Sequence, residues 1–313
     1  MRPPRSRQAA PSKPDSEADG SAGMRIAKAI ARAGLCSRRD AERWIEEGRV
    51  VVDGKTLTSP ALVVTGNEKI LVDGKALPQA DGVRLWRYHK PKGLVTTHKD
   101  PEGRETVFDK LPDAMPRVIS VGRLDYNSEG LLLLTNDGAL ARHMELPTTA
   151  WIRRYRARAW GNVTPEQLEA LSKGVTVDGV RYAPMEARLD REQGDNVWLT
   201  IGLREGKNRE VRNVLASLGM TVNRLIRVSY GPFQLQDLKP GEVQEVDRRV
   251  LRDQMGPQHA DALGLTGRAP DVAERPTARV RMPSRQVTKP EARPQQRAKS
   301  KPRPGGSRKA PSR

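Results

Sequence analysis

Cysteine and histidine are scarce in this chain of 313 residues. Cys36 is the single cysteine, which rules out a disulfide within the chain and agrees with a reducing compartment. The four histidines share no paired spacing and are far apart in the sequence: His89, His98, His143 and His259. Because a zinc site usually takes about four ligands from these residue types, we expect no metal site.

Long hydrophobic runs are also missing. No apolar run approaches the roughly 20 residues that a membrane-spanning helix needs. The first residues lack the apolar segment of a secretory signal. We therefore expect a soluble, cytoplasmic protein with no membrane partner.

Nucleotide-binding motifs are lacking as well. Residues 202–208 resemble a phosphate-binding loop, but three residues separate the two glycines where the motif has four. Asn208 stands where Ser or Thr would bind magnesium. No Gly-x-Gly-x-x-Gly follows a predicted strand, so a dinucleotide has no support. These absences argue against a nucleotide triphosphatase and against a nucleotide cofactor.

Positive charge is the dominant feature of the composition. The formal net charge of +18 predicts an anionic partner, most commonly nucleic acid. Residues 266–313 hold 14 Lys and Arg against 3 Asp and Glu and have few large apolar residues that could form a core. We expect a disordered basic tail over 256–313 and a shorter disordered arm over 1–23. The tail is either a solubilising extension or an arm that strengthens RNA binding.

The region after the first arm is predicted to contain two helices and two hairpins. Apolar residues at helical spacing predict a helix over 26–33. Ser37 with Asp40 three residues later resembles the capping box of a second helix. The β-branched runs 50–52 and 70–72 each precede Asp-Gly, the strongest short signal for a hairpin.

This region also resembles a known RNA-binding module, the alpha-L or S4-type domain. The resemblance rests on Arg-Ile-Ala-Lys at 25–28, Gly-Leu-Cys-Ser-Arg-Arg-Asp-Ala-Glu at 34–42 and Gly-Arg-Val-Val-Val-Asp-Gly at 48–54. A basic helix face taken alone would be ordinary solvated surface. The resemblance implies that residues 24–82 form this module and that its basic side chains contact RNA phosphates, which position a protein without reading sequence: Lys28, Arg38, Arg39, Arg43 and Arg49.

A second domain over 83–255 is predicted to have an α+β fold on a mostly antiparallel sheet, after a short polar linker at 79–82. The four leucines at 131–134, bounded by glycine and by Asn-Asp-Gly, predict a short buried strand closed by a tight turn. Alternation in 153–159 predicts a strand with arginines on one face and Tyr155 on the other.

One helix is predicted with particular clarity. Asn208 is its expected N-cap, and Gly219 follows its end. Apolar residues occur at i, i+3, i+4 and i+7, namely Val211, Val214, Leu215 and Leu218. The opposite face carries Arg209 and Arg212.

A glycine-punctuated loop over 121–130 holds Asp125 two residues after Arg123. Because the loop leads into the buried leucine strand, it is a rigid place for a reactive group. Taken alone, Asp125 would be a turn-forming aspartate that bonds its own backbone or pairs with Arg123. Tyr155 would be an ordinary cross-strand aromatic.

The wider context resembles the bacterial ribosomal RNA pseudouridine synthases, in the branch named for RsuA and RluB. The resemblance rests first on residues 122–138, where Arg-Leu-Asp precedes Gly-Leu-Leu-Leu-Leu-Thr-Asn-Asp-Gly. It also rests on Lys-Pro-Lys-Gly-Leu-Val at 90–95, Arg-Tyr-Arg at 154–156 and Arg-Glu-Gly-Lys-Asn-Arg-Glu-Val-Arg at 204–212. It covers residues 24 to about 250. Asp-Pro-Glu-Gly at 100–103 and the basic tail favour the large-subunit type.

The resemblance implies an isomerisation that needs no cofactor, with Asp125 as the catalytic carboxylate and Tyr155 stacked on the target base. Asp125 would attack the sugar or base as a nucleophile, or abstract a sugar proton on the way to a glycal. An adjacent cation, Arg212 or Arg123, would keep it ionised. Val211 would line the base pocket, and further phosphate contacts would come from Arg123, Arg154, Arg156, Lys207 and Arg209.

The expected partner is ribosomal RNA or a ribosomal assembly intermediate, bound by a monomer. The second hypothesis is a non-catalytic RNA-binding protein of ribosome assembly, for which the S4-type module and the tail would suffice. A DNA-binding protein is less supported, because neither helix pair offers base-reading residues at the spacing of a recognition helix.

Overall fold

The computed structural model describes residues 23–266. The ranges 1–22 and 267–313 lie outside the described residues, and with them most of the two arms expected to be disordered. Within the described part, no helix is long and apolar enough to span a membrane.

The N-terminal module has the two predicted helices, α1 (Ile26–Arg32) and α2 (Arg38–Glu46). Ser37 caps α2 as expected, since its hydroxyl oxygen accepts a hydrogen bond from the Asp40 amide at 3.1 Å. The apolar faces of both helices pack on the strands in one buried cluster. The strands are β1 (Met24–Arg25), β2 (Val50–Val52), β3 (Lys55–Thr56), β4 (Val63–Val64), β5 (Ile70–Val72) and β6 (Lys75–Ala76).

The two predicted hairpins are confirmed. Strands β2 and β5 are central in a sheet of order β3-β2-β5-β6, and β1 pairs separately with β4. At the first hairpin Asp53 and Gly54 both have positive φ, 48° and 80°. Two consecutive positive φ values are what a two-residue turn needs to match the strand twist, and Asp-Gly tolerates them.

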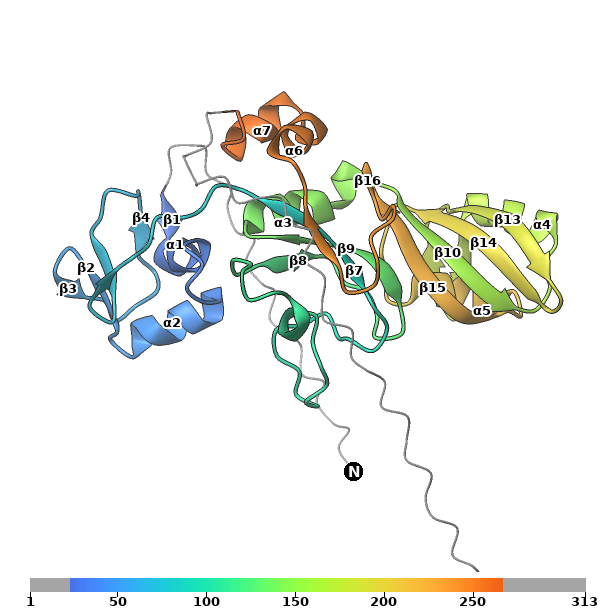
Figure 1. Ribbon diagram of the computed structural model, residues 1–313, viewed down its shortest axis with the longest axis horizontal. Helices are drawn as coiled ribbons and strands as arrows, with labels where there is room; N and C mark the ends of the chain where they lie inside the picture. Colours follow the sequence, from blue (N-terminus) through green and yellow to red (C-terminus); the bar gives the residue numbers. More distant parts are fainter. Residues whose placement is uncertain (1–22, 267–313) are drawn as a thin grey trace, which may run out of the picture. The chain divides into compact units, whose positions relative to one another are not determined.

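The second domain is built on a nine-stranded sheet with the order β13-β14-β10-β15-β9-β7-β17, to which β16 and β8 are attached (Figure 1). Its strands pair antiparallel, apart from a short parallel contact of β15 with β9, so the predicted α+β fold on a mostly antiparallel sheet is confirmed. The strands are β7 (Leu85–Lys90), β8 (Ile119–Val121), β9 (Glu129–Thr135), β10 (Arg153–Trp160), β13 (Glu186–Gln193), β14 (Asn196–Leu203), β15 (Thr221–Tyr230), β16 (Phe233–Gln234) and β17 (Val243–Glu245).

In the described part of the chain, five α-helices accompany this sheet: α3 (Gly138–Glu145), α4 (Pro165–Ala170), α5 (Glu210–Ser217), α6 (Arg248–Met255) and α7 (Pro257–Ala262). Smaller elements are three 3-10 turns and one hairpin: η1 (Phe108–Lys110), η2 (Pro147–Thr149), η3 (Leu171–Lys173), β11 (Val175–Val177) and β12 (Val180–Tyr182).

Strand β9 is buried along its whole length, as the four leucines predicted. Leu131 and Leu133 point into a cluster with α3, α6 and α7. Leu132 and Leu134 point the opposite way, against Tyr88 and other residues of a second cluster. Because side chains alternate between faces, a strand covered on both sides requires consecutive apolar residues.

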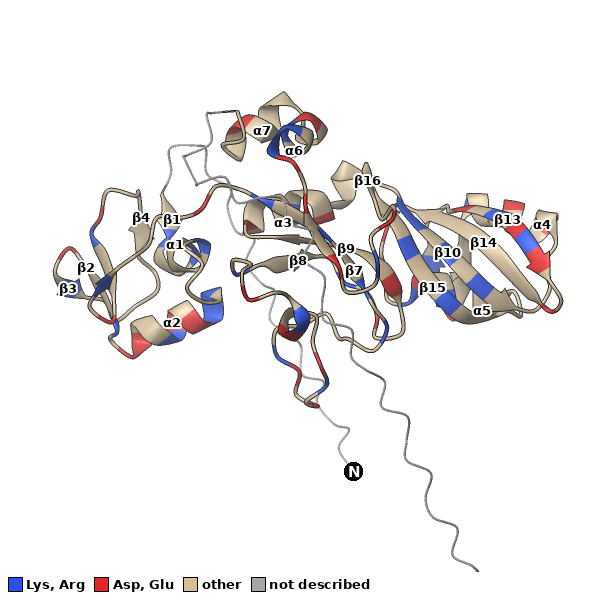
Figure 2. Ribbon diagram, viewed as in Figure 1, with Lys and Arg blue, Asp and Glu red and all other residues tan. Residues whose placement is uncertain are grey.

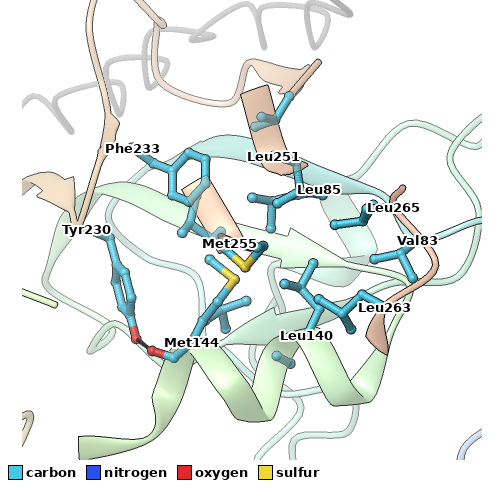
Figure 3. Packing of buried hydrophobic residues seen from close by; sticks show 14 of the residues in the cluster. Val83, Leu85, Leu140, Met144, Tyr230, Phe233, Leu251, Met255, Leu263 and Leu265 are labelled. Carbon is cyan, nitrogen blue, oxygen red and sulfur yellow. Dashed lines mark hydrogen bonds between the residues drawn. The ribbon is translucent and has the colours of Figure 1, made fainter. Parts of the chain in front are cut away.

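Figure 3 shows the cluster on the first side of β9. In this cluster Leu140 and Met144 of α3 pack together with Leu251 and Met255 of α6 and with Leu85 of β7. The hydroxyl of Tyr230 donates a hydrogen bond to the carbonyl oxygen of Met144 at 2.9 Å, so the buried phenol is satisfied.

Two details differ from the sequence prediction. The Asn-Asp-Gly run does not form the expected tight turn after the strand, because Asp137 caps α3 by accepting hydrogen bonds from the amides of Ala139 and Leu140 at 2.7 and 3.0 Å. The expected tail boundary at 256 is wrong for its first residues. Helix α7 follows α6 directly, and both Leu263 and Leu265 are buried in the same cluster as Leu251. These short helices carry many charged and polar residues and few apolar ones. The composition of this region therefore did not predict that it folds.

The first prediction concerns α6. Leu251→Ala should lower the free energy of unfolding by about 2–5 kcal/mol, since a buried leucine leaves a cavity when it is shortened. The adjacent Val250→Ala, at a side chain that is 47% exposed, should cost less than about 0.5 kcal/mol. Urea denaturation of both variants measures the difference, and equal losses would show that α6 does not pack as described.

Candidate active site

A cavity of about 290 Å³ opens where the loop before β9, the strands β10 and β15 and the start of α5 converge. Six residues singled out from the sequence line it: Arg123, Asp125, Tyr155, Lys207, Arg209 and Val211. Arg154, Arg156 and Arg212 are not among its lining residues. The sequence prediction therefore brought together most, but not all, of the residues at this site.

Lys90, the last residue of β7, anchors the loop that carries Asp125. Lys90 is fully buried, and its ammonium donates hydrogen bonds to the backbone carbonyl oxygens of Asp125 and Ser128 at 3.1 and 2.9 Å. It also reaches the carbonyl oxygens of Pro91 and Tyr126 at 3.1 and 3.4 Å. Burial lowers the pKa of Lys90 to about 8, while the carboxylates of Asp125 and Glu129 oppose that shift. Lys90 therefore remains charged near neutral pH, and its single ammonium group binds several backbone carbonyl oxygens of the same loop.

The junction of this loop with β9 is tightly constrained. Gly130 has φ of 105°, and a Cβ atom there would lie 2.4 Å from the carbonyl oxygen of Arg227 on β15. Only glycine permits both this backbone conformation and this close approach of the two strands. Next to it, the buried Glu129 accepts hydrogen bonds from Arg224 at 2.8 and 3.0 Å. The loop is thus fixed to β15 as well as to β7.

Within residues 23–266, the cation nearest to the Asp125 carboxylate is Arg209, whose Nη1 lies 4.0 Å from it. Arg209 occupies the N-cap position of α5 with φ of 50°, so Asn208 is not the cap and that expectation is wrong. The left-handed backbone conformation of Arg209 immediately precedes α5. The first residue of α5, Glu210, accepts a hydrogen bond from the Lys207 amide at 3.0 Å.

Arg212 lies close to the same loop but is engaged differently. It donates hydrogen bonds to the carbonyl oxygens of Val222 and Asn127 at 2.9 and 3.1 Å. Burial and the neighbouring Arg209 lower the pKa of Arg212, whereas Asp125 raises it. Arg212 therefore braces the loop backbone and contributes positive potential at Asp125 without a direct ion pair.

One wall of the cavity is apolar. Tyr155 and Val211 line it together with Leu203 and Leu225, which are buried in the core beneath α5. Tyr155 also packs against the cluster that contains Leu124, the residue before Asp125. A flat aromatic and aliphatic wall beside a carboxylate suits a planar base better than a sugar or a peptide.

Two arginines that the sequence prediction missed also line the cavity. Arg153 donates a hydrogen bond to the Tyr230 hydroxyl at 2.8 Å, and its guanidinium lies 4.6 Å from the centre of that ring. Arg227 is buried and donates from Nε to the Leu131 carbonyl oxygen at 2.7 Å. Both are far from Asp125 in sequence, and their positions depend on the pairing of β10 with β15. With Arg209 they give the cavity a positive potential suited to an anionic substrate.

Glu210 is the buried acid of the cavity. Burial, and secondarily the neighbouring Glu205 carboxylate, raises the pKa of Glu210 to about 7, against the hydrogen bond from the Lys207 amide. Nothing in the sequence pattern distinguished it from an exposed residue of the first helical turn.

Residues outside the cavity can be placed too. In the N-terminal module Arg49 pairs with Asp73 at 2.6 Å and lies over the Trp44 ring, while Arg43 pairs with Asp40 at 3.2 Å. The side chains of Lys28, Arg38 and Arg39 are exposed. The rings of His143 and His259, distant in sequence, lie 3.9 Å apart between their centres with an angle of 35° between their planes. Among residues 23–266, no group of three or more His, Cys, Asp and Glu side chains is arranged to hold a metal ion.

The chain is similar to several known proteins. A family model described as RNA pseudouridylate synthase matches residues 84–217, and the S4 domain model matches residues 24–75. An uncharacterised RNA pseudouridine synthase from Rickettsia felis is 49% identical over 228 residues, which cover 73% of this chain and 99% of that protein. The ribosomal large subunit pseudouridine synthase B of Pseudomonas aeruginosa is 39% identical over 280 residues, 86% of this chain and 72% of that protein. A pseudouridylate synthase crystal structure aligns with a TM-score of 0.51 at 25% identity, over 73% of this chain and 98% of that one.

The second prediction tests Lys90 as the anchor of the loop. Lys90→Met should lower the free energy of unfolding by about 2–4 kcal/mol, because it leaves several buried carbonyl oxygens without a donor. Lys92→Met is the matched control, since Lys92 is exposed and its amine lies 3.6 Å from Glu129 in a surface ion pair. It should cost less than about 1 kcal/mol. Similar losses in urea denaturation would contradict the anchoring role.

The third prediction concerns pH. Because the pKa of Glu210 is about 7 in the folded protein and about 4.5 when unfolded, the folded state binds more protons between these values. Stability should therefore fall by about 1–3 kcal/mol as pH rises from 4.5 to 7. Glu210→Gln should flatten this fall, because glutamine does not titrate in this range. Its amide oxygen can still accept the hydrogen bond from the Lys207 amide, so the helix start is preserved. Glu169→Gln, at an exposed site on α4, should leave it unchanged. An unaltered fall in Glu210→Gln would assign the dependence to other groups.

Proposed function

The chain belongs to the RNA pseudouridine synthases and carries an S4 domain, and we propose that it converts a uridine of large-subunit ribosomal RNA to pseudouridine with Asp125 as the catalytic carboxylate. Enzymes of this family are isomerases that act on RNA. The observation that supports the assignment of Asp125 is its place in the cavity: it is held rigidly, faces Arg209 and stands beside an apolar wall with Tyr155.

The reaction can be followed in terms of bonds. The bond between N1 of uracil and C1′ of ribose breaks, and a bond between C5 and C1′ forms in its place. N1 gains a proton, and the proton on C5 is lost to solvent, so the product is an isomer and no cofactor is consumed. Asp125 would either form a transient covalent bond or remove a sugar proton. In both routes it must be ionised, and the guanidinium groups of Arg209 and Arg212 lie close to its loop.

Tyr155 and Val211 would hold the uracil after it leaves the RNA stack. A base within a helix or loop must be extruded before its glycosidic bond is accessible. The cavity of about 290 Å³ has room for one nucleotide base, and Tyr155 offers an aromatic face for it. Lys207, Arg123 and Arg153 surround this position and would contact the adjoining phosphates.

The assignment of substrate rests on relatives. The name of the Pseudomonas aeruginosa protein specifies the large ribosomal subunit. The S4 domain would hold ribosomal RNA, or a ribosomal assembly intermediate, through the phosphate contacts of Lys28, Arg38, Arg39, Arg43 and Arg49. We propose that the enzyme does so as a monomer in the cytoplasm.

The fourth prediction separates catalysis from binding. Asp125→Asn should reduce tritium release from RNA labelled at C5 of uridine by at least about 10³-fold, while affinity for the same RNA stays within about threefold. Asp113→Asn makes the same change at an exposed site outside the cavity and should keep full activity. A non-catalytic assembly protein would show no tritium release in the wild type, and unchanged release in Asp125→Asn would remove Asp125 from the mechanism.

A further inference from the structure

Strands β13, β14, β10 and β15 have one covered face and one open face. Residues such as Ala157, Leu199 and Leu225 lie on the covered face, where they pack with α4 and α5 in one cluster. Tyr155 belongs to this face and lines the cavity. Since side chains alternate along each strand, the intervening residues point away from the cavity. We call this open side the arginine face and define it by Arg158, Trp160, Arg188, Arg191, Trp198 and Arg224.

The strand register aligns these residues in a row. Arg191 is opposite Trp198, Trp198 is opposite Arg158, and Arg158 is opposite Arg224. Like charges directly opposite each other on neighbouring strands are destabilising. Glu129 compensates Arg224 through two hydrogen bonds. The Nε atom of Arg158 is buried and has no hydrogen-bond partner within residues 23–266. A bound anion would offset the repulsion between Arg158 and Arg224.

Acidic side chains on the same face neutralise only part of the charge. Asp190 lies 3.1 Å from Arg188 and 3.7 Å from Arg156, and Glu186 lies 3.4 Å from Arg154. Such exposed pairs contribute little and are readily exchanged for other partners. Figure 2 shows the resulting concentration of Lys and Arg along β10 and β15.

Two tryptophans accompany the arginines. Trp160, at the end of β10, is 53% exposed. Trp198 lies on the same face with the guanidinium of Arg156 4.8 Å from its ring centre. Exposed aromatic rings between cations are the typical arrangement for unpaired nucleic acid, because bases stack on the rings while phosphates meet the cations. A duplex would present no free base faces to them.

We propose that the arginine face binds a single-stranded segment of the RNA substrate, separate from the nucleotide in the cavity. This inference rests on the proposed function for the identity of the ligand. The face and the cavity share β10, and Lys92, Glu129 and Arg224 form a chain of ion pairs that leads from the face to the loop of Asp125. RNA on this face would therefore engage the enzyme from the side opposite to the pocket and add affinity without touching the reacting base.

Arg188→Ala/Arg191→Ala tests the charge of the face. The probe is a fluorescein-labelled single-stranded RNA of 25 nucleotides (mixed uridine and adenosine), and binding to the full chain is followed by fluorescence anisotropy. The double variant should bind about 5–10-fold more weakly at low salt, and the slope of log affinity against log salt should fall by about 1.4, or roughly 0.7 per lost phosphate contact. Arg249→Ala/Arg252→Ala on α6, two exposed arginines elsewhere, should change affinity less than about twofold.

Trp160→Ala tests stacking. It should weaken the same RNA about fivefold or more, and Trp160→Phe should restore most of the loss, because base stacking needs an aromatic ring. All binding is measured in Asp125→Asn protein as well as in the wild type. The result is therefore independent of turnover, and a failed catalytic assignment would not alter it.

Two outcomes would overturn this inference. One is unchanged affinity and salt slope in the double arginine variant. The other is displacement of the RNA by polyglutamate of equal charge together with no effect of Trp160→Ala, which would identify the face as a surface for acidic protein.

Discussion

The burial of one ammonium group, that of Lys90, is the constraint on which the site depends. It lies at the end of β7 opposite Gly130 of β9, just where the loop of Asp125 leads into the sheet. An uncompensated charge in this position would be costly, and the backbone carbonyls of the loop compensate it. The loop conformation and the charge of Lys90 therefore require each other. Such an arrangement keeps a partly exposed carboxylate in place before any substrate is bound, which is a condition for efficient catalysis.

The second constraint is the short parallel contact of β9 with β15. It joins the part of the sheet covered by α3, α6 and α7 to the part covered by α4 and α5. Because Gly130 and Arg227 approach so closely there, the loop of Asp125 comes within reach of residues from β10, β15 and α5. The cavity thus exists only when both parts of the sheet are assembled. Its apolar wall comes from the core, and its cations come from the strand ends and the start of α5.

The sequence predicted the local elements well, because their signals are local. The leucines of β9, the Ser37 cap and the Asp-Gly hairpins each depend on neighbours within a few residues. Asp125, Tyr155 and Val211 were placed together through resemblance to a family, and the structure brings them to one cavity. Arg153 and Arg227 were not found, because strand pairing between distant segments decides their position. The partner of Asp125 was left open between Arg212, through the family resemblance, and Arg123, whereas the left-handed backbone of Arg209 brings the Arg209 guanidinium to 4.0 Å from the carboxylate.

The central claim is that this chain modifies ribosomal RNA through Asp125. The most direct measurement is pseudouridine mapping of ribosomal RNA from cells that lack the protein, supplied with either the wild type or Asp125→Asn. The account predicts that one uridine of the large-subunit RNA loses its modification and that only the wild type restores it. Persistence of every pseudouridine without the protein, or equal restoration by Asp125→Asn, would contradict the claim.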